Sequence, residues 1–264
     1  MSEAGTADPT RPLADALVAY GFTPVGAELW SRFVDEVCLI LDGAAAELRS
    51  PEAWAAFSSK RGALSVPKVR GRRKATVQTP LEDAITAELG HIARRLRAAV
   101  PAGHFLRQHE VAFATEHLVE SATRTGRHSR KVDFFIYAQT DEIAPELAIE
   151  AKPLLTTGDI ASRYLAEEGI GCFFAMDTAY TDQPLAGMLA YTIDALSGSR
   201  GAGIRSGVEA MTPTPLTSEL VAIAGSVQGR LCSRHDRSAL SLGPVAIIHL
   251  EMTFAPVEEP VAGA

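Results

Sequence analysis

The sequence predicts an α/β protein with a mixed central β-sheet flanked by helices. Three observations predict this class. Apolar residues recur at helical spacing up to about residue 100, and segments rich in β-branched and aromatic residues follow them. Helical and strand-like segments then alternate, which is typical of a sheet covered by helices. The chain has 264 residues and is 47% hydrophobic, so it can bury a substantial core.

The first part of the chain is predicted to be helical. We expect a disordered tail at 1–12, helices over 13–57 with a break between Gly21 and Gly26, and a basic connection at 58–78. Thr79 and Pro80 are a good N-cap and first residue for a helix that continues to about Val100. Residues 13–78 would then be an N-terminal helical extension and basic connection, 79–255 the α/β core, and 256–264 a disordered tail.

The core is predicted to alternate strands with helices. We expect strands at 104–116, 131–138, 146–155, 169–176 and 245–254, and a polar hairpin turn at 121–129. Helices are expected at 159–168, 184–196 and 216–231, with a flexible Gly- and Ser-rich loop at 197–215.

The composition argues against several classes of protein. Cys38, Cys172 and Cys232 lie far apart in the sequence, so we interpret them as core residues in a reducing, cytoplasmic compartment. The histidines show no metal-binding spacing. No segment approaches the roughly 18 apolar residues of a membrane span, and the N-terminus lacks the pattern of a signal peptide. We therefore expect no membrane partner.

Two basic segments contrast with the net charge of −7. Residues 60–74 contain seven basic residues and no acidic one, and a second basic segment covers 124–131. Each is either a solvated loop or an edge that contacts nucleic-acid phosphates. Arg163 is either a solvated helix residue or a further phosphate contact. The predicted phosphate contacts are Lys68, Arg70, Arg72, Arg73, Lys74, Arg127, Arg130, Lys131 and Arg163.

Charged residues interrupt two otherwise apolar strands. In 146–155, Glu150 and Lys152 share one face with Ala148. Asp133 lies in the preceding apolar strand, so the two carboxylates can converge if the strands are neighbours. Such carboxylates stay ionised together only if a cation joins them, and oxygen ligands select Mg²⁺ or Mn²⁺. The lysine would orient a water or meet charge on a phosphoryl group.

The arrangement of Asp133, sixteen further residues and then Glu150-Ala151-Lys152 resembles the PD-(D/E)XK nuclease superfamily. The matching segments are RKVDFFIYA and ELAIEAK, and the resemblance covers about residues 79–180. It implies a restriction-endonuclease-like core in which Asp133 and Glu150 bind the metal. It also implies that the Ala151 carbonyl adds a ligand and that Lys152 positions the attacking water.

Many members of the superfamily place a glutamate on a helix before these strands, and Glu82 occupies that place here. The resemblance makes Glu82 a catalytic and metal-binding residue, but Glu82 could equally complete a capping box with Thr79. Asp83 and Glu88 are the substitutes in that case. The Gln-x-x-x-Tyr helix of RecB-like exonucleases is missing after Lys152, where Arg163 and Tyr164 stand instead.

Together the residues and the resemblance predict a nuclease that uses Mg²⁺ or Mn²⁺ to hydrolyse phosphodiester bonds, with DNA as the expected nucleic acid. Restriction or phage defence is a role suggested only by analogy. The alternative is a non-catalytic module of the same fold that binds nucleic acid or a protein. A homodimer is compatible with the sequence.

Overall fold

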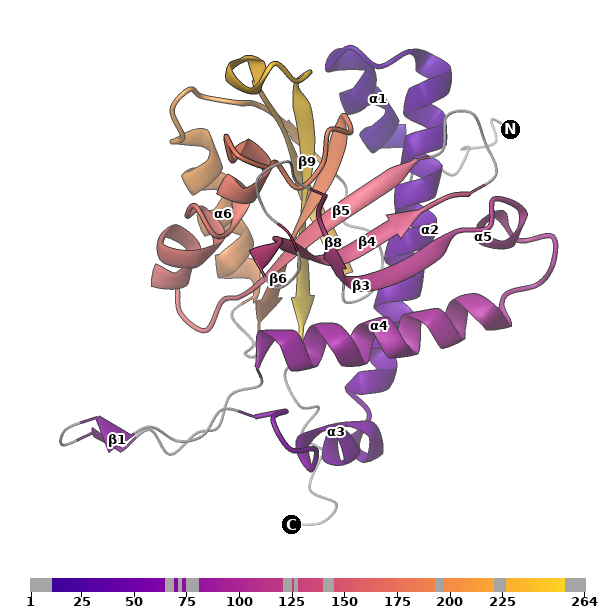
Figure 1. Ribbon diagram of the computed structural model, residues 1–264, viewed down its shortest axis with the longest axis vertical. Helices are drawn as coiled ribbons and strands as arrows, with labels where there is room; N and C mark the ends of the chain where they lie inside the picture. The colour runs from indigo at the N-terminus through magenta and orange to yellow at the C-terminus, as the bar shows by residue number, and fades with distance from the viewer. Residues whose placement is uncertain are drawn as a thin grey trace, which may run out of the picture.

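A computed structural model describes residues 11–64, 69–70, 73–74, 81–120, 125, 128–139, 145–192, 197–220 and 227–254. At its centre is a seven-stranded mixed sheet with the strand order β3-β4-β5-β6-β9-β8-β7 (Figure 1). Its strands are β3 (Ala112–Leu118), β4 (Lys131–Tyr137), β5 (Glu146–Pro153), β6 (Leu185–Thr192), β7 (Leu216–Glu219), β8 (Val227–His235) and β9 (Val245–Thr253). The neighbours β5, β6 and β9 run parallel, and the other pairs are antiparallel.

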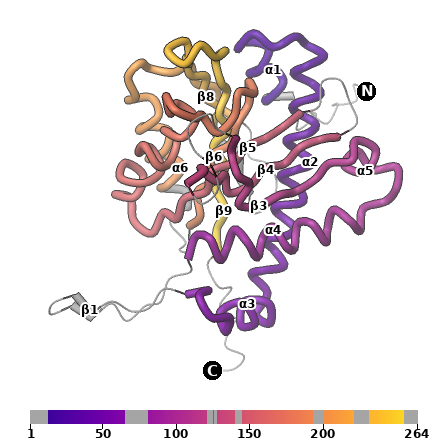
Figure 2. The backbone as a smooth tube through the Cα atoms, in the orientation of Figure 1, coloured from indigo at the N-terminus to yellow at the C-terminus, as the bar shows by residue number. Residues whose placement is uncertain are grey.

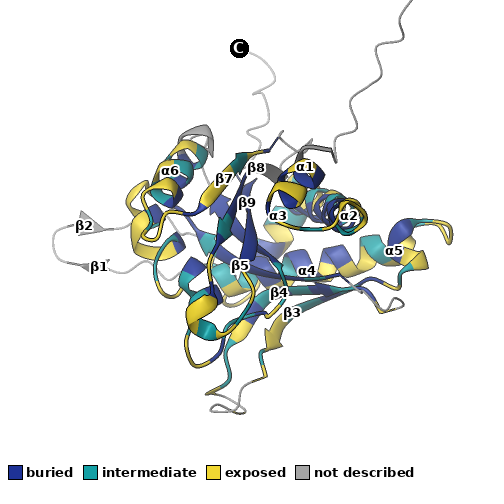
Figure 3. Cartoon of the chain, turned by 90° about the horizontal axis from the view of Figure 1, so that it is seen from above, coloured by how far each residue is buried: buried dark blue, intermediate teal, exposed yellow. Residues whose placement is uncertain are grey.

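Helices cover both faces of this sheet. They are α1 (Arg11–Ala19), α2 (Pro24–Leu48), α3 (Pro51–Ser58), α4 (Glu82–Ala99), α5 (Phe105–Gln108) and α6 (Ser197–Glu209). Helices α1, α2 and α4 lie on one side and α6 on the other (Figure 3). A π-helical turn at Ile160–Tyr164 and a 3-10 turn at Ile170–Phe174 connect β5 to β6, and a further 3-10 turn is Ser238–Leu240. The short strands β1 (Val69–Arg70) and β2 (Arg73–Lys74) pair as a separate ribbon.

The N-terminal helices share one apolar core with the sheet. Helix α2 begins after Thr23, whose hydroxyl accepts a hydrogen bond from the Gly26 amide at 3.1 Å. It buries a stripe that includes Phe33, Val37 and Leu41. These residues belong to the same cluster as the inner faces of β4, β5 and β9. Burial of this apolar surface ties the first helices to the sheet. Figure 2 traces the chain path.

The first helices and the strands around the acidic residues agree with the sequence predictions. The helices predicted over 13–57 form with a break at 20–23, although α1 already starts at Arg11, inside the predicted tail. The strands at 131–138, 146–155 and 245–254 form as β4, β5 and β9. Residues 1–10, 255–264, parts of the basic connection and most of the 121–129 turn lie outside the described residues.

Two predictions before β4 are wrong. Helix α4 begins at Glu82 with Leu81 as its N-cap, and Leu81 makes no side-chain capping hydrogen bond. The capping role given to Thr79 is therefore wrong, and Thr79 itself lies outside the described residues. The strand predicted at 104–116 forms only from Ala112, as β3, and its first part is the short helix α5, where the His104 side chain accepts a hydrogen bond from the Leu106 amide.

The predictions between β5 and β9 are largely wrong. Residues 159–168 form only a single π-helical turn, and 169–176 form a 3-10 turn instead of a strand. Residues 184–196 contain the central strand β6 instead of a helix, and 197–215 contain helix α6 instead of a loop. Residues 216–231 contain β7 and the start of β8 instead of a helix. Among the described residues, no helix is long and apolar enough to cross a membrane.

Candidate metal centre

Three carboxylates from three elements meet at one point of the fold. Glu82 lies in the first turn of α4, Asp133 on β4 and Glu150 on β5. One oxygen of each lies within 4.8 Å of the others. The predicted residues Asp133 and Glu150 are thus brought together, and Glu82 joins them.

The end of the β4–β5 ladder aims Asp133 at the centre. The antiparallel register runs from Tyr137 opposite Glu146 to Phe134 opposite Ile149. Beyond that pair, Asp133 Oδ2 accepts a hydrogen bond from the Ala151 amide at 2.7 Å. The carboxylate thus takes the place of a ladder carbonyl and is held beside Glu150. The amide of Ala151 therefore supports the centre.

Lys152 bridges two of the carboxylates. Its Nζ lies 2.6 Å from Glu150 Oε1 and 2.7 Å from Glu82 Oε1. Glu150 and Lys152 are two residues apart on β5 and share a face, while Ile149 and Ala151 face the cluster beneath α2 and α4. The predicted alternation along this strand is therefore confirmed.

The carboxylate of Glu150 has a buried oxygen to which a cation could bind. Only 4% of Glu150 is exposed. Its Oε2 is buried and receives no hydrogen bond from any described residue. A buried carboxylate oxygen without a partner costs free energy, and a cation would remove that cost. Because the three side chains offer oxygen ligands only, they fit a hard divalent ion such as Mg²⁺ or Mn²⁺.

Burial and crowding disfavour negative charge at the centre. Burial raises the pKa of Asp133 to about 6, and the hydrogen bond from Ala151 only partly opposes it. Burial and the charge of Asp133 raise the pKa of Glu150 to about 9. Burial lowers the pKa of Lys152, but the charges of Glu150 and Glu82 outweigh it and the net shift is upward. Lys152 therefore stays protonated.

Sequence reasoning missed three residues next to this centre. Tyr180 and Cys172 lie close enough that the charge of Glu150 raises the pKa of both, after burial as the largest cause. The hydroxyl of the fully buried Tyr191 lies 3.0 Å from Thr86 Oγ1 and so joins β6 to the first turns of α4. No spacing in the sequence could have indicated these residues, because only the packing of β6 and the 3-10 turn brings them here.

Of the residues predicted to contact phosphates, three contact other protein groups in the structure, and the side chains of the other six are not described. Arg130 pairs with Asp177 at 3.3 Å, and Lys131 pairs with Glu116 at 3.0 Å. Arg163 Nη1 donates to the Pro153 carbonyl at 3.4 Å. Lys68, Arg72 and Arg127, and the side chains of Arg70, Arg73 and Lys74, lie outside the described residues.

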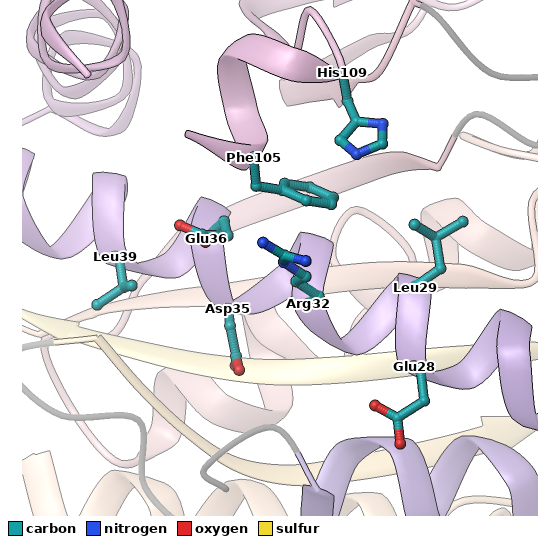
Figure 4. Close-up of a pocket in the computed structure, with 8 residues that line it drawn as sticks. All are labelled: Glu28, Leu29, Arg32, Asp35, Glu36, Leu39, Phe105 and His109. Carbon is teal, nitrogen blue, oxygen red and sulfur yellow. The ribbon is translucent and has the colours of Figure 1, made fainter. Parts of the chain in front are cut away.

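A cavity opens beside the carboxylates. It has a volume of about 450 Å³ and its lining includes Glu82, Lys152, Ser162 and Arg163. A larger cleft of about 660 Å³ lies between α2 and α5, where the Arg32 guanidinium carbon is 4.8 Å from the centre of the Phe105 ring (Figure 4). None of the residues of the acidic cluster lines that cleft, whereas Glu82 of the cluster and the neighbouring Lys152 line the smaller cavity.

Comparison of the chain with protein-family models, curated proteins and solved structures found no match. The interpretation of the centre therefore depends on its own chemistry. Three converging carboxylates, one of them almost fully buried, and an adjacent ammonium group form a candidate site for a hard divalent cation.

Proposed function

We propose that this chain is a divalent-metal-dependent nuclease that hydrolyses phosphodiester bonds, with DNA as the expected substrate. The observation that carries the proposal is the meeting of Glu82, Asp133 and Glu150 within 4.8 Å, with Lys152 in direct contact with two of them. This combination offers an ion site and a fixed positive charge at a single point beside a cavity.

Each residue of the centre has a distinct role in this mechanism. Glu82, Asp133 and Glu150 would hold Mg²⁺ or Mn²⁺, and the Ala151 carbonyl is a further candidate ligand. A bound ion of this kind supplies an activated water and stabilises the charge on phosphate oxygens. Lys152 cannot act as a base because it stays protonated, so its ammonium group donates hydrogen bonds that orient the water and the scissile phosphate.

The order of elements supports a restriction-endonuclease-like core. Helix α4 is followed by the antiparallel strands β3, β4 and β5, and β6 then adds parallel to β5. The resemblance of Asp133 and Glu150-Ala151-Lys152 to the PD-(D/E)XK superfamily implies this order. A role in restriction or phage defence follows from that resemblance by analogy alone.

The test is cleavage of plasmid DNA and labelled oligonucleotides with Mg²⁺, Mn²⁺ or EDTA. We expect cleavage with either ion and none with EDTA. Lys152→Ala and Glu150→Gln should each lower the rate at least about 100-fold, since each removes a group that acts on the transition state. Arg95→Ala is the matched control, because Arg95 forms an exposed ion pair with Glu47 away from the centre.

Two outcomes would contradict the proposal. Equal cleavage by wild type and Lys152→Ala would exclude the mechanism. Nucleic-acid binding that survives Glu150→Gln, without metal-dependent cleavage of any DNA or RNA, would favour the alternative of a non-catalytic binding module.

A further inference from the structure

The outer part of the sheet leaves one face open next to the metal centre. Along β4, Phe134 and Ile136 are buried in the cluster beneath α2 and α4, whereas Phe135 and Tyr137 are partly exposed. Helix α4 covers the buried side of β3 and β4, and α6 packs at β8 and β9. On the other side of β4, Phe135 packs at the edge of the cluster that contains Ala148 and Phe173, and Asp133 and Tyr137 stay partly exposed.

Three rings on this open face form a stack, which we name the aromatic row: His117, Phe135 and Tyr137. The His117 and Phe135 rings are nearly parallel, with an interplanar angle of 8° and centroids 4.2 Å apart. The Tyr137 ring centroid lies 5.3 Å from that of Phe135. Because Phe135 covers one face of the exposed His117 imidazole, the other face of the imidazole is presented to solvent.

Small neighbours leave the aromatic row accessible. Across from Phe135 and Tyr137 on β3 are Ala114 and Ala112, and across from Phe135 on β5 is Ala148. Methyl side chains cannot cover aromatic rings on a pleated sheet. The rings therefore offer an apolar surface that is already ordered before any ligand binds.

The aromatic row leads directly into the metal centre. Asp133 and Phe135 are two residues apart on β4, so their backbones lie about 7 Å apart along the strand. His117 pairs with Val132, the residue before Asp133. A ligand that stacks on the imidazole would thus have its neighbouring groups within reach of Asp133 and Glu150.

We infer that the substrate is single-stranded nucleic acid, with one unpaired base stacked on His117 and an adjacent phosphate at the carboxylates. This inference rests on the proposed nuclease function and deepens it. An unpaired base exposes its faces to aromatic side chains, whereas a base inside a duplex already stacks on its neighbours. Lys131 lies two residues before Asp133 at the start of β4, and by exchanging its exposed ion pair with Glu116 it can meet the next phosphate.

Binding to single and double strands tests this inference. Fluorescence anisotropy would compare the binding of a labelled oligothymidylate with that of a duplex of equal length. Both are measured in Mg²⁺ with the Lys152→Ala protein, because this variant leaves the nucleic acid intact. Adding His117→Ala should weaken single-strand binding about 10-fold and leave duplex binding unchanged. His117→Phe should restore the affinity, because it restores the ring. His91→Ala is the matched control, since His91 is an exposed histidine on α4.

A spectroscopic signal separates stacking from a general loss of structure. Fluorescence of 2-aminopurine placed in the oligonucleotide should be quenched on binding to the protein with His117 or to the His117→Phe variant. It should be quenched less by His117→Ala, with an unchanged melting temperature. Binding and cleavage of the single strand at an unchanged level in His117→Ala would overturn the inference and leave the nuclease proposal standing. Stacking at His117 without metal-dependent cleavage of any nucleic acid would support the ligand and contradict the nuclease.

Discussion

Asp133 and Glu150 hold their protons more tightly in the folded chain than in the unfolded chain. Burial raises the pKa of Asp133 from 3.8 to about 6, and burial with the charge of Asp133 raises the pKa of Glu150 from 4.5 to about 9. For an acid with a raised pKa, the stabilisation is complete below the unfolded pKa and is lost as pH rises through the folded pKa. The centre therefore destabilises the metal-free chain at neutral and alkaline pH.

We expect the free energy of unfolding of the EDTA-treated protein to fall between pH 6.5 and pH 9, because the folded chain still holds on Glu150 a proton that the unfolded chain has lost. Mg²⁺ should reverse the fall, because binding to the folded state alone stabilises it. Urea unfolding across this pH range measures the effect. The difference between wild type and Glu150→Gln isolates it, and equal pH profiles of the two proteins would contradict this assignment.

Two fully buried serines differ in their hydrogen bonds. Ser233 Oγ lies 2.7 Å from His235 Nε2 and 2.8 Å from His249 Nε2, and His249 Nδ1 lies 3.1 Å from the Tyr164 hydroxyl. Ser31 Oγ, on α2, has no hydrogen-bond partner among the described residues. Removing the two hydroxyls should therefore have different effects.

We expect Ser233→Ala to lower the free energy of unfolding by about 1–3 kcal/mol, because it leaves buried imidazole nitrogens without a partner. Ser31→Ala should be neutral or stabilising, since alanine suits a helix interior better than serine and no hydrogen bond is lost. Urea denaturation measures the stability of both variants. At pH 7.5 both His235 and His249 are neutral, because burial lowers the pKa of each imidazole. Equal losses of stability would show that the hydrogen bonds do not matter.

At the scale of elements, the sequence predicted correctly those strands whose residue pattern carries a clear local signal. Strand β4 was predictable because it is rich in β-branched and aromatic residues, and in β5 the charged Glu150 and Lys152 stand out among Leu, Ala and Ile. Strand β6 is buried at every position because it lies in the parallel, two-sided centre of the sheet. Its apolar run has no period of two, so the sequence pattern does not distinguish this strand from a buried helix.

Helix α6 could not be predicted, because tertiary contacts rather than helix propensity form it. Its sequence SGSRGAGIRSGVE is rich in glycine, which disfavours a helix. A Cβ on Gly203 would lie 2.6 Å from Ile160 Cδ1, and one on Gly207 would lie 2.3 Å from Leu165 Cδ1. The glycines thus allow α6 to approach the segment around the π-helical turn, and such a contact leaves no local signal. Tyr180 was missed for the same reason.

Close packing of α4 on β3 leads to a test at this scale. A Cβ on Gly90 would lie 2.2 Å from Thr115 Cγ2. We expect Gly90→Ala to destabilise the protein by about 1–3 kcal/mol despite the better helix propensity of alanine, because the overlap pushes the helix from the sheet. Thr115→Ser removes the methyl group and should recover most of the loss in the double variant. Thermal or urea unfolding of the three variants would decide, and a stabilised Gly90→Ala would contradict the packing.

At the scale of the whole molecule, the carboxylates meet because the pairing of β4 with β5 stops where α4 begins. The β4–β5 ladder stops beside Asp133, β5 continues as a parallel neighbour of β6, and α4 starts at Glu82. The buried core beneath α2 and α4 fixes these three elements relative to each other. Electrostatic repulsion within the cluster is thus imposed by the fold, and a bound cation is the simplest means of relieving it.

The most direct test of this account is to soak crystals of the full chain in Mn²⁺ and locate the ion by its anomalous scattering. We expect a single strong peak at the centre, coordinated by carboxylate oxygens of both Asp133 and Glu150, and its loss in Glu150→Gln. Unoccupied carboxylates in wild-type crystals at saturating Mn²⁺, or an ion bound only elsewhere on the chain, would contradict the central claim.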